Sequence, residues 1–296
     1  MDFKTELAKD QEIVNSELKK YLRKQDCKER ILNEAMEYSL MAGGKRLRPI
    51  LVLETFKLFN ENLEKIMPYA ISIEMVHNAS LIHDDLPGID NDDFRHGKPT
   101  NHKKFNEATA ILAGDGLFNY AYILISNNLQ KTEDMQELKR KLEIFNEFSV
   151  ATDRMLAGEY LDTEFEGKEI SANDLEYIHE NKTGAYLKLC ARMGAILGGA
   201  TEKELEKITT YAEKIGLAFQ IKDDILSEIG DEKITGKPVG NDKEKQKCTY
   251  VSEYGLERAK EILHLITNEA ISELEEFGQK AEFLQNLAKY IETRNK

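Results

Sequence analysis

Two acid-rich stretches contain the side chains best suited to metal chemistry. The first runs His83-Asp84-Asp85-Leu86-Pro87-Gly88-Ile89-Asp90, and the second runs Gln220-Ile221-Lys222-Asp223-Asp224-Ile225-Leu226. Each ends an apolar run with helical spacing, where an unpaired carboxylate is costly. Two such clusters facing each other across an apolar space would repel unless divalent cations lay between them. We expect Mg²⁺, because it takes oxygen ligands and usually shares itself with substrate phosphates.

The spacing within the first stretch predicts how its carboxylates meet. On a helix, His77, Ser80 and Asp84 fall on one face. Pro87-Gly88 interrupts the helix directly afterwards, and a bulge there can bring Asp90 back, so that two carboxylates hold one ion. The alternative is that residues 84–93 form a solvated acidic loop. The apolar residues before this segment and the basic residues after it favour the ion site.

Basic side chains occur beside glycines and acidic clusters. Three of them crowd the segment between Gly44 and Pro49, namely Lys45, Arg46 and Arg48. Cations at the start of a helix are unfavourable unless an anion joins them, and a diphosphate would resolve that conflict. Further basic residues close to the acidic clusters or glycines are Arg95, Lys182, Lys237 and Lys247. Each alone would usually be a solvated surface charge, so their placement is what favours an anion site.

The elements that must position these residues are helices. There is no proline between Pro99 and Pro238, and apolar residues in that stretch recur every three or four positions. Residues 31–40 predict an amphipathic helix that stops at Gly43-Gly44, a glycine C-cap, and Pro49 falls in the first turn of the next helix. We expect one all-α domain spanning 1–296. The polar segment 228–247 is interpreted as a functional lid, with a solvated surface loop as the alternative.

Composition excludes several classes of protein. The chain has 296 residues, 41% of them hydrophobic, which is enough for a sizeable core and argues against disorder. A net charge of −13 argues against a general nucleic-acid binder. The cysteines Cys27, Cys190 and Cys248 have neither disulfide nor metal spacing. The first residues lack the apolar stretch of a signal peptide, and we expect no membrane insertion. These features predict a cytoplasmic protein.

The histidines raise zinc as an alternative metal. Four of the six histidines, His77, His83, His96 and His102, lie in the first acidic region. Their spacings match no common zinc pattern, and hard carboxylates dominate the region. For His83 we expect a packed ring that is hydrogen-bonded to backbone. No Ser-His-Asp or Cys-His arrangement is present, so the sequence does not support nucleophilic catalysis by a side chain.

The motifs, taken in order, closely resemble the trans-isoprenyl diphosphate synthases, most closely their bacterial farnesyl diphosphate synthase type. They are Gly43-Gly44-Lys45-Arg46-Leu47-Arg48-Pro49, His77, Asp84-Asp85 with Asp90, Arg95-His96-Gly97-Lys98-Pro99-Thr100, Gly158-Glu159-Tyr160-Leu161-Asp162, Lys182-Thr183-Gly184, Phe219-Gln220-Ile221-Lys222-Asp223-Asp224, Gly236-Lys237, Lys247-Cys248-Thr249-Tyr250 and Arg294-Asn295-Lys296. The resemblance implies an all-helical bundle around a deep central cavity, a homodimer, and a reaction that uses three Mg²⁺ ions.

The resemblance also implies roles for individual residues. An allylic diphosphate, dimethylallyl or geranyl, would bind Mg²⁺ held by Asp84, Asp85, Asp90 and Asp223. Isopentenyl diphosphate would bind Lys45, Arg48 and His77, near His96. The departing diphosphate would be stabilised by Arg95, Lys182 and Lys247, with Thr183 and Gln220 lining the site. Loss of diphosphate would leave an allylic cation for the second substrate's double bond to attack.

Three positions depart from the family pattern. Ser227 stands where a third Asp of the second motif is usual, so we expect weaker metal binding and retained activity. His96 replaces the second residue of an Arg pair, and a neutral imidazole is a poorer diphosphate clamp, so binding there should be weaker and pH-dependent. Glu159 takes a position usually held by Gln, and the sequence assigns it no role.

Product length is left open between two values. Farnesyl-type enzymes usually carry an aromatic cavity floor five positions before the first Asp, where this chain has Ala79 followed by Ser80. Overall similarity favours the fifteen-carbon farnesyl product, placed slightly ahead, whereas the small residues favour geranylgeranyl diphosphate. A class I terpene cyclase would not need the Lys45, Arg48 and His77 site. A catalytically inert partner subunit would have lost metal ligands. Ser227 points that way, but Asp84, Asp85, Asp90, Asp223 and Asp224 are all present.

Overall fold

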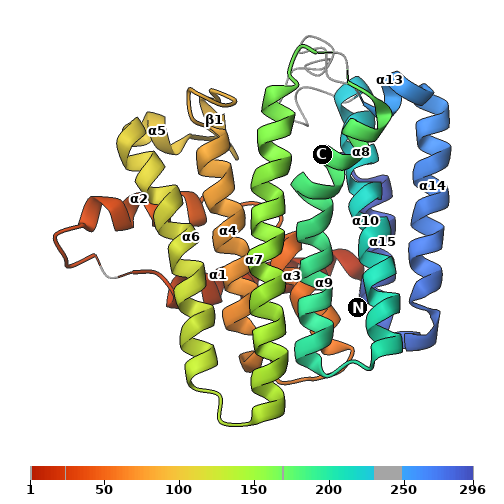
Figure 1. Cartoon of the computed structure of the whole chain (residues 1–296), viewed down its shortest axis with the longest axis horizontal. Helices are drawn as coiled ribbons and strands as arrows, with labels where there is room; N and C mark the ends of the chain where they lie inside the picture. The colour runs from red at the N-terminus through yellow and green to blue at the C-terminus, as the bar shows by residue number, and fades with distance from the viewer. Residues whose placement is uncertain (1, 24, 169, 230–248, 296) are drawn as a thin grey trace. The chain divides into compact units, whose positions relative to one another are not determined.

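Helices form nearly all of the regular structure in this computed structural model, which describes residues 2–23, 25–168, 170–229 and 249–295 (Figure 1). The strands among these residues are the short pair β1 (Phe94–Arg95) and β2 (Lys98–Pro99), joined as an antiparallel hairpin. The predicted all-α class is therefore confirmed. Lys237, Lys247 and the predicted lid lie outside the described residues, apart from the first two positions of that segment.

The chain contains two compact units. The N-terminal unit comprises Met1–Leu53 and Asn62–Glu143, and the C-terminal unit comprises Glu54–Glu61 and Ile144–Lys296. The prediction of one domain spanning 1–296, with a central cavity, stays a prediction.

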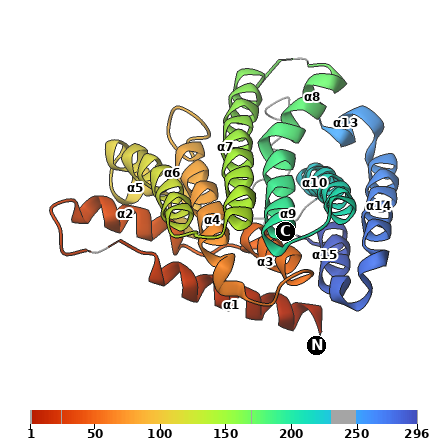
Figure 2. The same ribbon diagram turned by 60° about the horizontal axis from the view of Figure 1, so that its bottom comes forward.

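Helix α4 (Met67–Asp84) is the centre of the N-terminal unit. It packs along α6 (Glu107–Gln130), and it also contacts α1 (Phe3–Lys20) and α2 (Arg30–Leu40) (Figures 1 and 2). Most positions of α4 are buried, as expected of a helix that is apolar on several faces. This packing makes α4 a firm support for His77 and Asp84. The remaining helices of this unit include η1 (Leu63–Lys65) and α5 (Asn101–Lys104).

The glycines after α2 do not cap that helix, which corrects the predicted C-cap. Helix α2 ends at Leu40, where the N–H of Met41 donates to the Glu37 carbonyl at 2.8 Å and the N–H of Ala42 donates to the Ser39 carbonyl at 3.1 Å. Gly43 and Gly44 follow in the loop with φ of 119° and 112°, a conformation that glycine adopts without steric cost. Helix α3 (Leu47–Lys57) then begins, so Pro49 does lie in its first turn.

Helix α10 (Glu202–Ile229) is the centre of the C-terminal unit. It contacts α9 (Ala185–Gly198), α14 (Leu256–Glu273) and α15 (Glu282–Thr293) (Figure 2). Its buried residues recur every three or four positions, which is the helical spacing of a core element. The other helical segments are α7 (Met135–Glu164), which enters this unit at Ile144, α8 (Ala172–His179), the π-helix η2 (Glu180–Gly184), α13 (Tyr250–Tyr254) and η3 (Glu275–Ala281).

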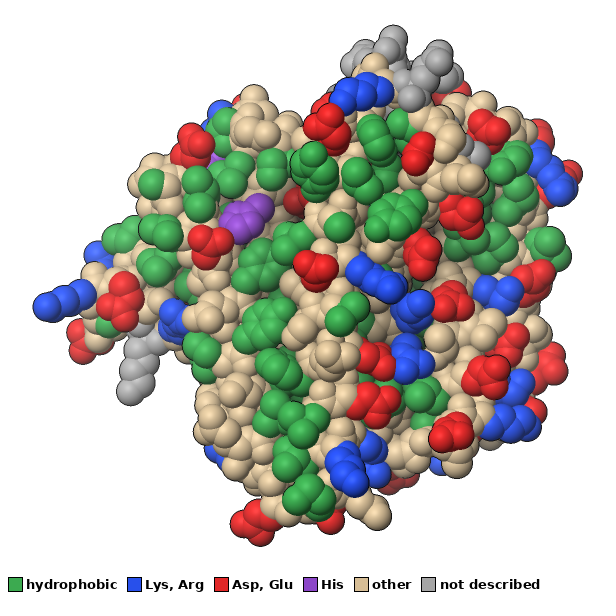
Figure 3. Space-filling model, in the orientation of Figure 1, with side chains coloured by type: hydrophobic (Ala, Val, Ile, Leu, Met, Phe, Trp, Pro, Cys, Tyr) green, Lys and Arg blue, Asp and Glu red, His purple; other side chains and the backbone are tan. Residues whose placement is uncertain are grey.

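Helix α6 has an exposed apolar face. By length and composition alone it is long and apolar enough to cross a membrane. Asp115 lies within it, and no membrane-spanning helix was predicted from the sequence. Part of the helix is buried because α4 packs along it. Ile111, Leu112 and Ile123 remain exposed, and hydrophobic side chains are visible over α6 in Figure 3.

Candidate active site

The chain turns back on itself directly after α4, as the Pro87-Gly88 pair predicts. Helix α4 ends at Asp84, and the N–H of Asp90 donates to the Asp84 carbonyl oxygen at 2.9 Å. The Leu86 carbonyl accepts from the N–H groups of Ile89 and Asn91, which closes the loop. The backbones of Asp84 and Asp90 are therefore adjacent at the end of α4.

Asp85 has a different environment from Asp84 and Asp90. It is 3% exposed, and its Oδ1 accepts from Arg95 Nε at 2.7 Å and lies 2.5 Å from Arg95 Nη2. Burial raises the pKa of Asp85, while the hydrogen bond from Arg95 opposes that shift. Asp85 therefore orients Arg95 in this structure, a pairing that sequence spacing did not reveal.

The oxygen donors at the end of α4 fit a magnesium ion. In the part of the chain that the structure describes, no group of three or more His, Cys, Asp or Glu side chains converges as a metal site. Mg²⁺ is commonly held by one or two carboxylates, with water and substrate phosphate as its other ligands. Asp84 and Asp90 can supply such a pair. A metal here would be completed by the substrate.

Arg46 supports the cationic loop (Gly43–Arg48) from inside the N-terminal unit. Its Nη1 lies 2.5 Å from Glu74 Oε1, and both side chains are almost fully buried. Arg46 also donates to the Leu40 carbonyl at 2.6 Å and to Asn15 Oδ1 at 3.0 Å. Asn78 donates to the same Glu74 oxygen at 3.0 Å. Of the three basic residues in the loop, Arg46 is therefore a structural one.

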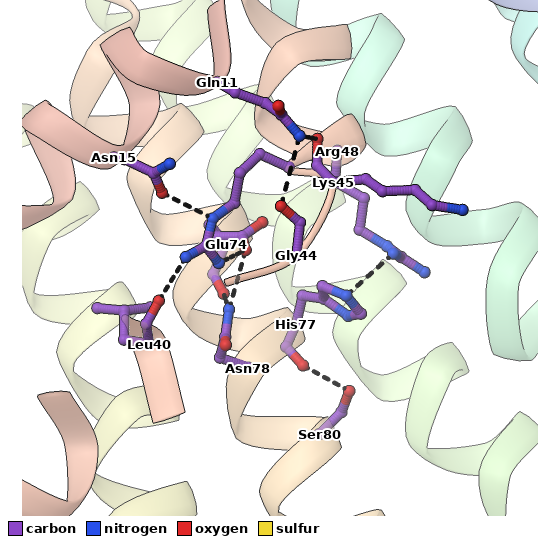
Figure 4. Close-up of polar contacts among 11 residues, drawn as sticks. Gln11, Asn15, Leu40, Gly44, Lys45, Arg48, Glu74, His77, Asn78 and Ser80 are labelled. Atoms are coloured by element: carbon purple, nitrogen blue, oxygen red, sulfur yellow. Dashed lines mark hydrogen bonds and ion pairs between the residues drawn. The ribbon is translucent and has the colours of Figure 1, made fainter. Parts of the chain in front are cut away.

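Lys45 and Arg48 do not share the buried surroundings of Arg46. The Lys45 side chain extends away from the Glu74 network, while Gln11 Nε2 donates to the Lys45 carbonyl at 2.9 Å (Figure 4). Arg48 Nη1 lies 3.2 Å from His77 Nε2. Burial and the nearby arginines, Arg48 foremost, lower the pKa of His77 well below its ordinary value. A neutral His77 can accept a hydrogen bond from Arg48.

His96 joins the same loop from the β1–β2 hairpin. The two-residue turn is His96-Gly97, and both residues have positive φ, 50° and 75°. A Cβ on Gly44 would lie 3.4 Å from His96 Nε2, so the ring sits against the cationic loop. Burial, together with Arg95, Arg46 and Lys45, lowers the pKa of His96. The four residues predicted for one diphosphate, Lys45, Arg48, His77 and His96, thus lie in one region.

The second acidic cluster is on α10 in the C-terminal unit. Asp223 is half-exposed, and its Oδ1 lies 2.5 Å from Nη2 of Arg294, whose guanidinium also stacks on the Phe219 ring. Asp224 is buried and its Oδ2 accepts from the Tyr250 N–H at 2.8 Å. Asp224 therefore anchors the start of α13, whereas Asp223 remains accessible to an ion.

Gln220 and Ser227 complete one face of α10. Both lie a helical turn from Asp223 and are partly exposed. The hydroxyl at Ser227 adds no charge, so Asp223 is the acidic residue on this face. The predicted meeting of Asp223 with Asp84, which belongs to the N-terminal unit, stays a prediction.

Lys182 is held between two carboxylates. Its Nζ lies 2.7 Å from Glu159 Oε2 and 2.7 Å from Asp162 Oδ2, both on α7. Burial alone would lower the pKa of Lys182, but Asp162 and Glu159 together raise it above the ordinary value, so the ammonium stays charged. Asp162 was missed as a partner, although its spacing of three from Glu159 places both acids on one helical face.

Lys182 and Thr183 lie in η2, which closely approaches α7. A Cβ on Gly158 would lie 2.3 Å from the Lys182 backbone nitrogen, so this position requires glycine. Thr183 is buried, 7% exposed. Single π-helical turns are frequent at functional sites, and this one presents the Lys182 ammonium beside the α7 acids.

Ala79, Ser80 and His83 lie in the C-terminal half of α4. Ala79 is fully buried, 0% exposed, whereas Ser80 is partly exposed on the face that carries His77 and Asp84, and its hydroxyl donates to the His77 carbonyl at 2.9 Å. His83 Nε2 lies 3.1 Å from the Ile111 carbonyl, which confirms the packed, backbone-bonded histidine.

Known proteins resemble this chain along most of its length. The polyprenyl synthetase family matches residues 29–287. A farnesyl diphosphate synthase of Bacillus subtilis is 40% identical over 98% of this chain and 97% of its own, and a geranylgeranyl diphosphate synthase of Cyanophora paradoxa is 42% identical over 88% and 87%. The crystal structure of an FPP/GFPP synthase from Zymomonas mobilis has a TM-score of 0.86 and 33% identity, and it covers 99% of both chains. The chain belongs to the polyprenyl synthetase family and is a prenyltransferase.

Proposed function

We propose that this prenyltransferase condenses isopentenyl diphosphate with dimethylallyl or geranyl diphosphate to give farnesyl diphosphate. The observation that supports the proposal is that helix α4 carries one member of each of two different candidate anion sites, namely His77 and Asp84. Asp84 and Asp90 offer carboxylates for a metal-bound diphosphate, whereas Lys45, Arg48 and neutral His77 offer a cationic site without metal. His77 and Asp84 are separated by about 10 Å along α4, at 1.5 Å per residue. Two diphosphates could therefore lie side by side.

The metal-holding residues in this proposal are Asp84, Asp90 and Asp223. Asp85 accepts a hydrogen bond from Arg95 and orients it. Magnesium bound there, three ions by analogy with the family, would neutralise the diphosphate and make it a better leaving group. Arg95, Lys182 and Lys247 would add positive charge at the departing oxygens. Lys247 lies outside the described residues. The apolar helices around these groups would exclude water from the allylic cation.

The second site would hold isopentenyl diphosphate in position for attack. Lys45 and Arg48 would bind its phosphate oxygens, and His77 would orient Arg48. Thr183 and Gln220 would lie near the developing cation. This second diphosphate site is what separates the proposal from a terpene cyclase, which uses one diphosphate. The carbocation that condensation leaves on the joined chain then loses a proton to the released diphosphate, which completes the reaction without a side-chain nucleophile.

Geranylgeranyl diphosphate is the alternative product. Ala79 and Ser80 are small, and no aromatic ring stands at either position to limit the growing chain. The test is to supply geranyl diphosphate with excess isopentenyl diphosphate and to separate the products by length. Dominant fifteen-carbon product supports the proposal. Dominant twenty-carbon product would replace it with the alternative, and Ala79→Tyr should then shorten the product. Absence of condensation would overturn both.

A homodimer in the cytoplasm is part of the same proposal. The exposed apolar residues Ile111, Leu112 and Ile123 on α6 support docking of a second copy, because such a face is costly in water. Asp115 on the same helix disfavours a lipid environment, so we assign α6 to protein contact instead of a membrane. The wide cysteine spacing fits a reducing compartment. Sedimentation of wild type and Leu112→Glu tests the dimer, which the variant should weaken.

A further inference from the structure

Glu159 gives Lys182 one more carboxylate than is needed to balance its charge. Both Glu159 Oε2 and Asp162 Oδ2 lie 2.7 Å from Lys182 Nζ, so one ammonium serves two acids. The three side chains are each partly buried, 18 to 30% exposed, which limits screening by water. One ammonium and two carboxylates give these three side chains a formal net charge of −1. A lysine intended for a diphosphate is thus held in an anionic environment.

The backbone keeps Lys182 at these acids. At the position of Gly158, a Cβ would lie 2.3 Å from the Lys182 nitrogen and 2.7 Å from its Cα, so α7 and η2 are in direct contact. Glu159 follows Gly158 directly, and Asp162 lies one helical turn further along α7. The pairing therefore follows from close backbone packing as well as from side-chain attraction.

We propose that Glu159 is a positioning residue that withholds Lys182 from the substrate diphosphate and thereby sets the affinity of that site. This inference rests on the proposed function, in which Lys182 binds the leaving diphosphate. An ammonium has three donors, and two of them are directed at carboxylates here. A diphosphate that takes the third donor lies close to two carboxylates, and one that draws the ammonium away leaves a carboxylate facing a second anion. Glutamine at 159 would keep the size and the hydrogen bond but remove the charge.

The test is a set of four proteins: wild type, Glu159→Gln, Lys182→Met and the double variant. Calorimetry with inorganic pyrophosphate and Mg²⁺ measures affinity without turnover. Glu159→Gln should bind pyrophosphate on the order of tenfold more tightly, which is about 1.4 kcal/mol. The gain should disappear in the Lys182→Met background, because Glu159 acts through that lysine. The KM for geranyl diphosphate should fall in parallel.

Glu147→Gln is the matched control. Glu147 is another α7 glutamate in an ion pair, 2.6 Å from Arg192, but it lies outside the candidate site. Its pyrophosphate affinity should equal that of wild type. Circular dichroism verifies that every variant is folded.

Three outcomes contradict the inference. Unchanged or weaker pyrophosphate binding by Glu159→Gln overturns it, as does an equal gain in the Lys182→Met background, which would indicate direct repulsion by Glu159. If wild type condenses geranyl and isopentenyl diphosphates while these results hold, the proposed function survives and the role of Glu159 fails. If wild type neither condenses them nor binds pyrophosphate, the proposed function itself fails and the inference with it.

Discussion

Replacing Arg46 with methionine should remove the main support of the cationic loop. The Arg46 and Glu74 side chains are 2% and 3% exposed, and Arg46 also donates to the Leu40 carbonyl and to Asn15. Removing one partner of a buried ion pair costs about 3–5 kcal/mol, because the other charge stays buried without compensation. An ordinary protein has roughly 5–15 kcal/mol of stability in total. Arg46→Met should therefore lose a large share of it.

Urea unfolding followed by far-UV circular dichroism measures this loss. Lys168→Met is the control, because Lys168 and Glu164 form a surface pair with side chains 54% and 49% exposed. Such pairs contribute about 0–1 kcal/mol. The double variant Arg46→Met with Glu74→Leu should be more stable than Arg46→Met alone, since no unpaired carboxylate is then left inside.

Activity gives a second readout of the same perturbation. The loop carries Lys45 and Arg48, so a folded Arg46→Lys variant should raise the KM for isopentenyl diphosphate more than that for geranyl diphosphate. Lysine keeps the charge but lacks the fork that reaches Glu74, Leu40 and Asn15 together. A stability loss below about 1 kcal/mol for Arg46→Met, or single-variant losses that simply add in the double variant, would refute a buried, coupled pair.

Three further predictions follow from other positions. Gly158→Ala should lower stability by roughly 1–3 kcal/mol, because its Cβ would lie 2.3 Å from the Lys182 nitrogen; an unchanged thermal midpoint would contradict this close packing. Burial and nearby arginines lower the pKa of His77 in the folded chain. Near pH 6.5 the imidazole is therefore protonated in the unfolded chain but stays neutral in the folded chain. Stability should therefore fall as the pH drops below about 6.5 and level off above it, and in urea titrations His77→Gln should flatten that slope, whereas an identical slope would argue against His77 as its source. Ser80→Phe should shorten the product more than Ala79→Tyr, because Ser80 is the partly exposed one; equal product lengths by chromatography would refute this.

The sequence was sufficient to predict the helices and the turn that brings the first carboxylates together. Apolar spacing identified the long helices, because burial of one face imposes it. Pro87-Gly88 predicted the end of α4 and the return to Asp90, which the hydrogen bond to Asp84 confirms. His83 was also interpreted correctly, since its ring lies against a backbone carbonyl.

Side-chain direction was harder to predict, because spacing does not say which of several neighbouring charges turns inward. The loop Lys45-Arg46-Leu47-Arg48 offered three cations, and the structure buries Arg46 alone, 4% exposed, with φ of 55°. Neither the Asp85–Arg95 pair nor the Lys182 cluster was found, since the first depends on how the chain folds back after α4 and the second on the packing of η2 against α7. The glycine C-cap of α2 was wrong because that helix ends at Leu40, with Met41 as its cap, two residues before Gly43.

A crystal structure with Mg²⁺ and a non-reactive allylic diphosphate analogue tests the central proposal most directly. The carboxylates of Asp84, Asp90 and Asp223 should contact ions that share one diphosphate, and Lys45 and Arg48 should contact no metal. Asp223 Oδ1 should bind an ion in place of Arg294. Asp84 and Asp223 in separate solvent regions, with the diphosphate bound by neither, would contradict it.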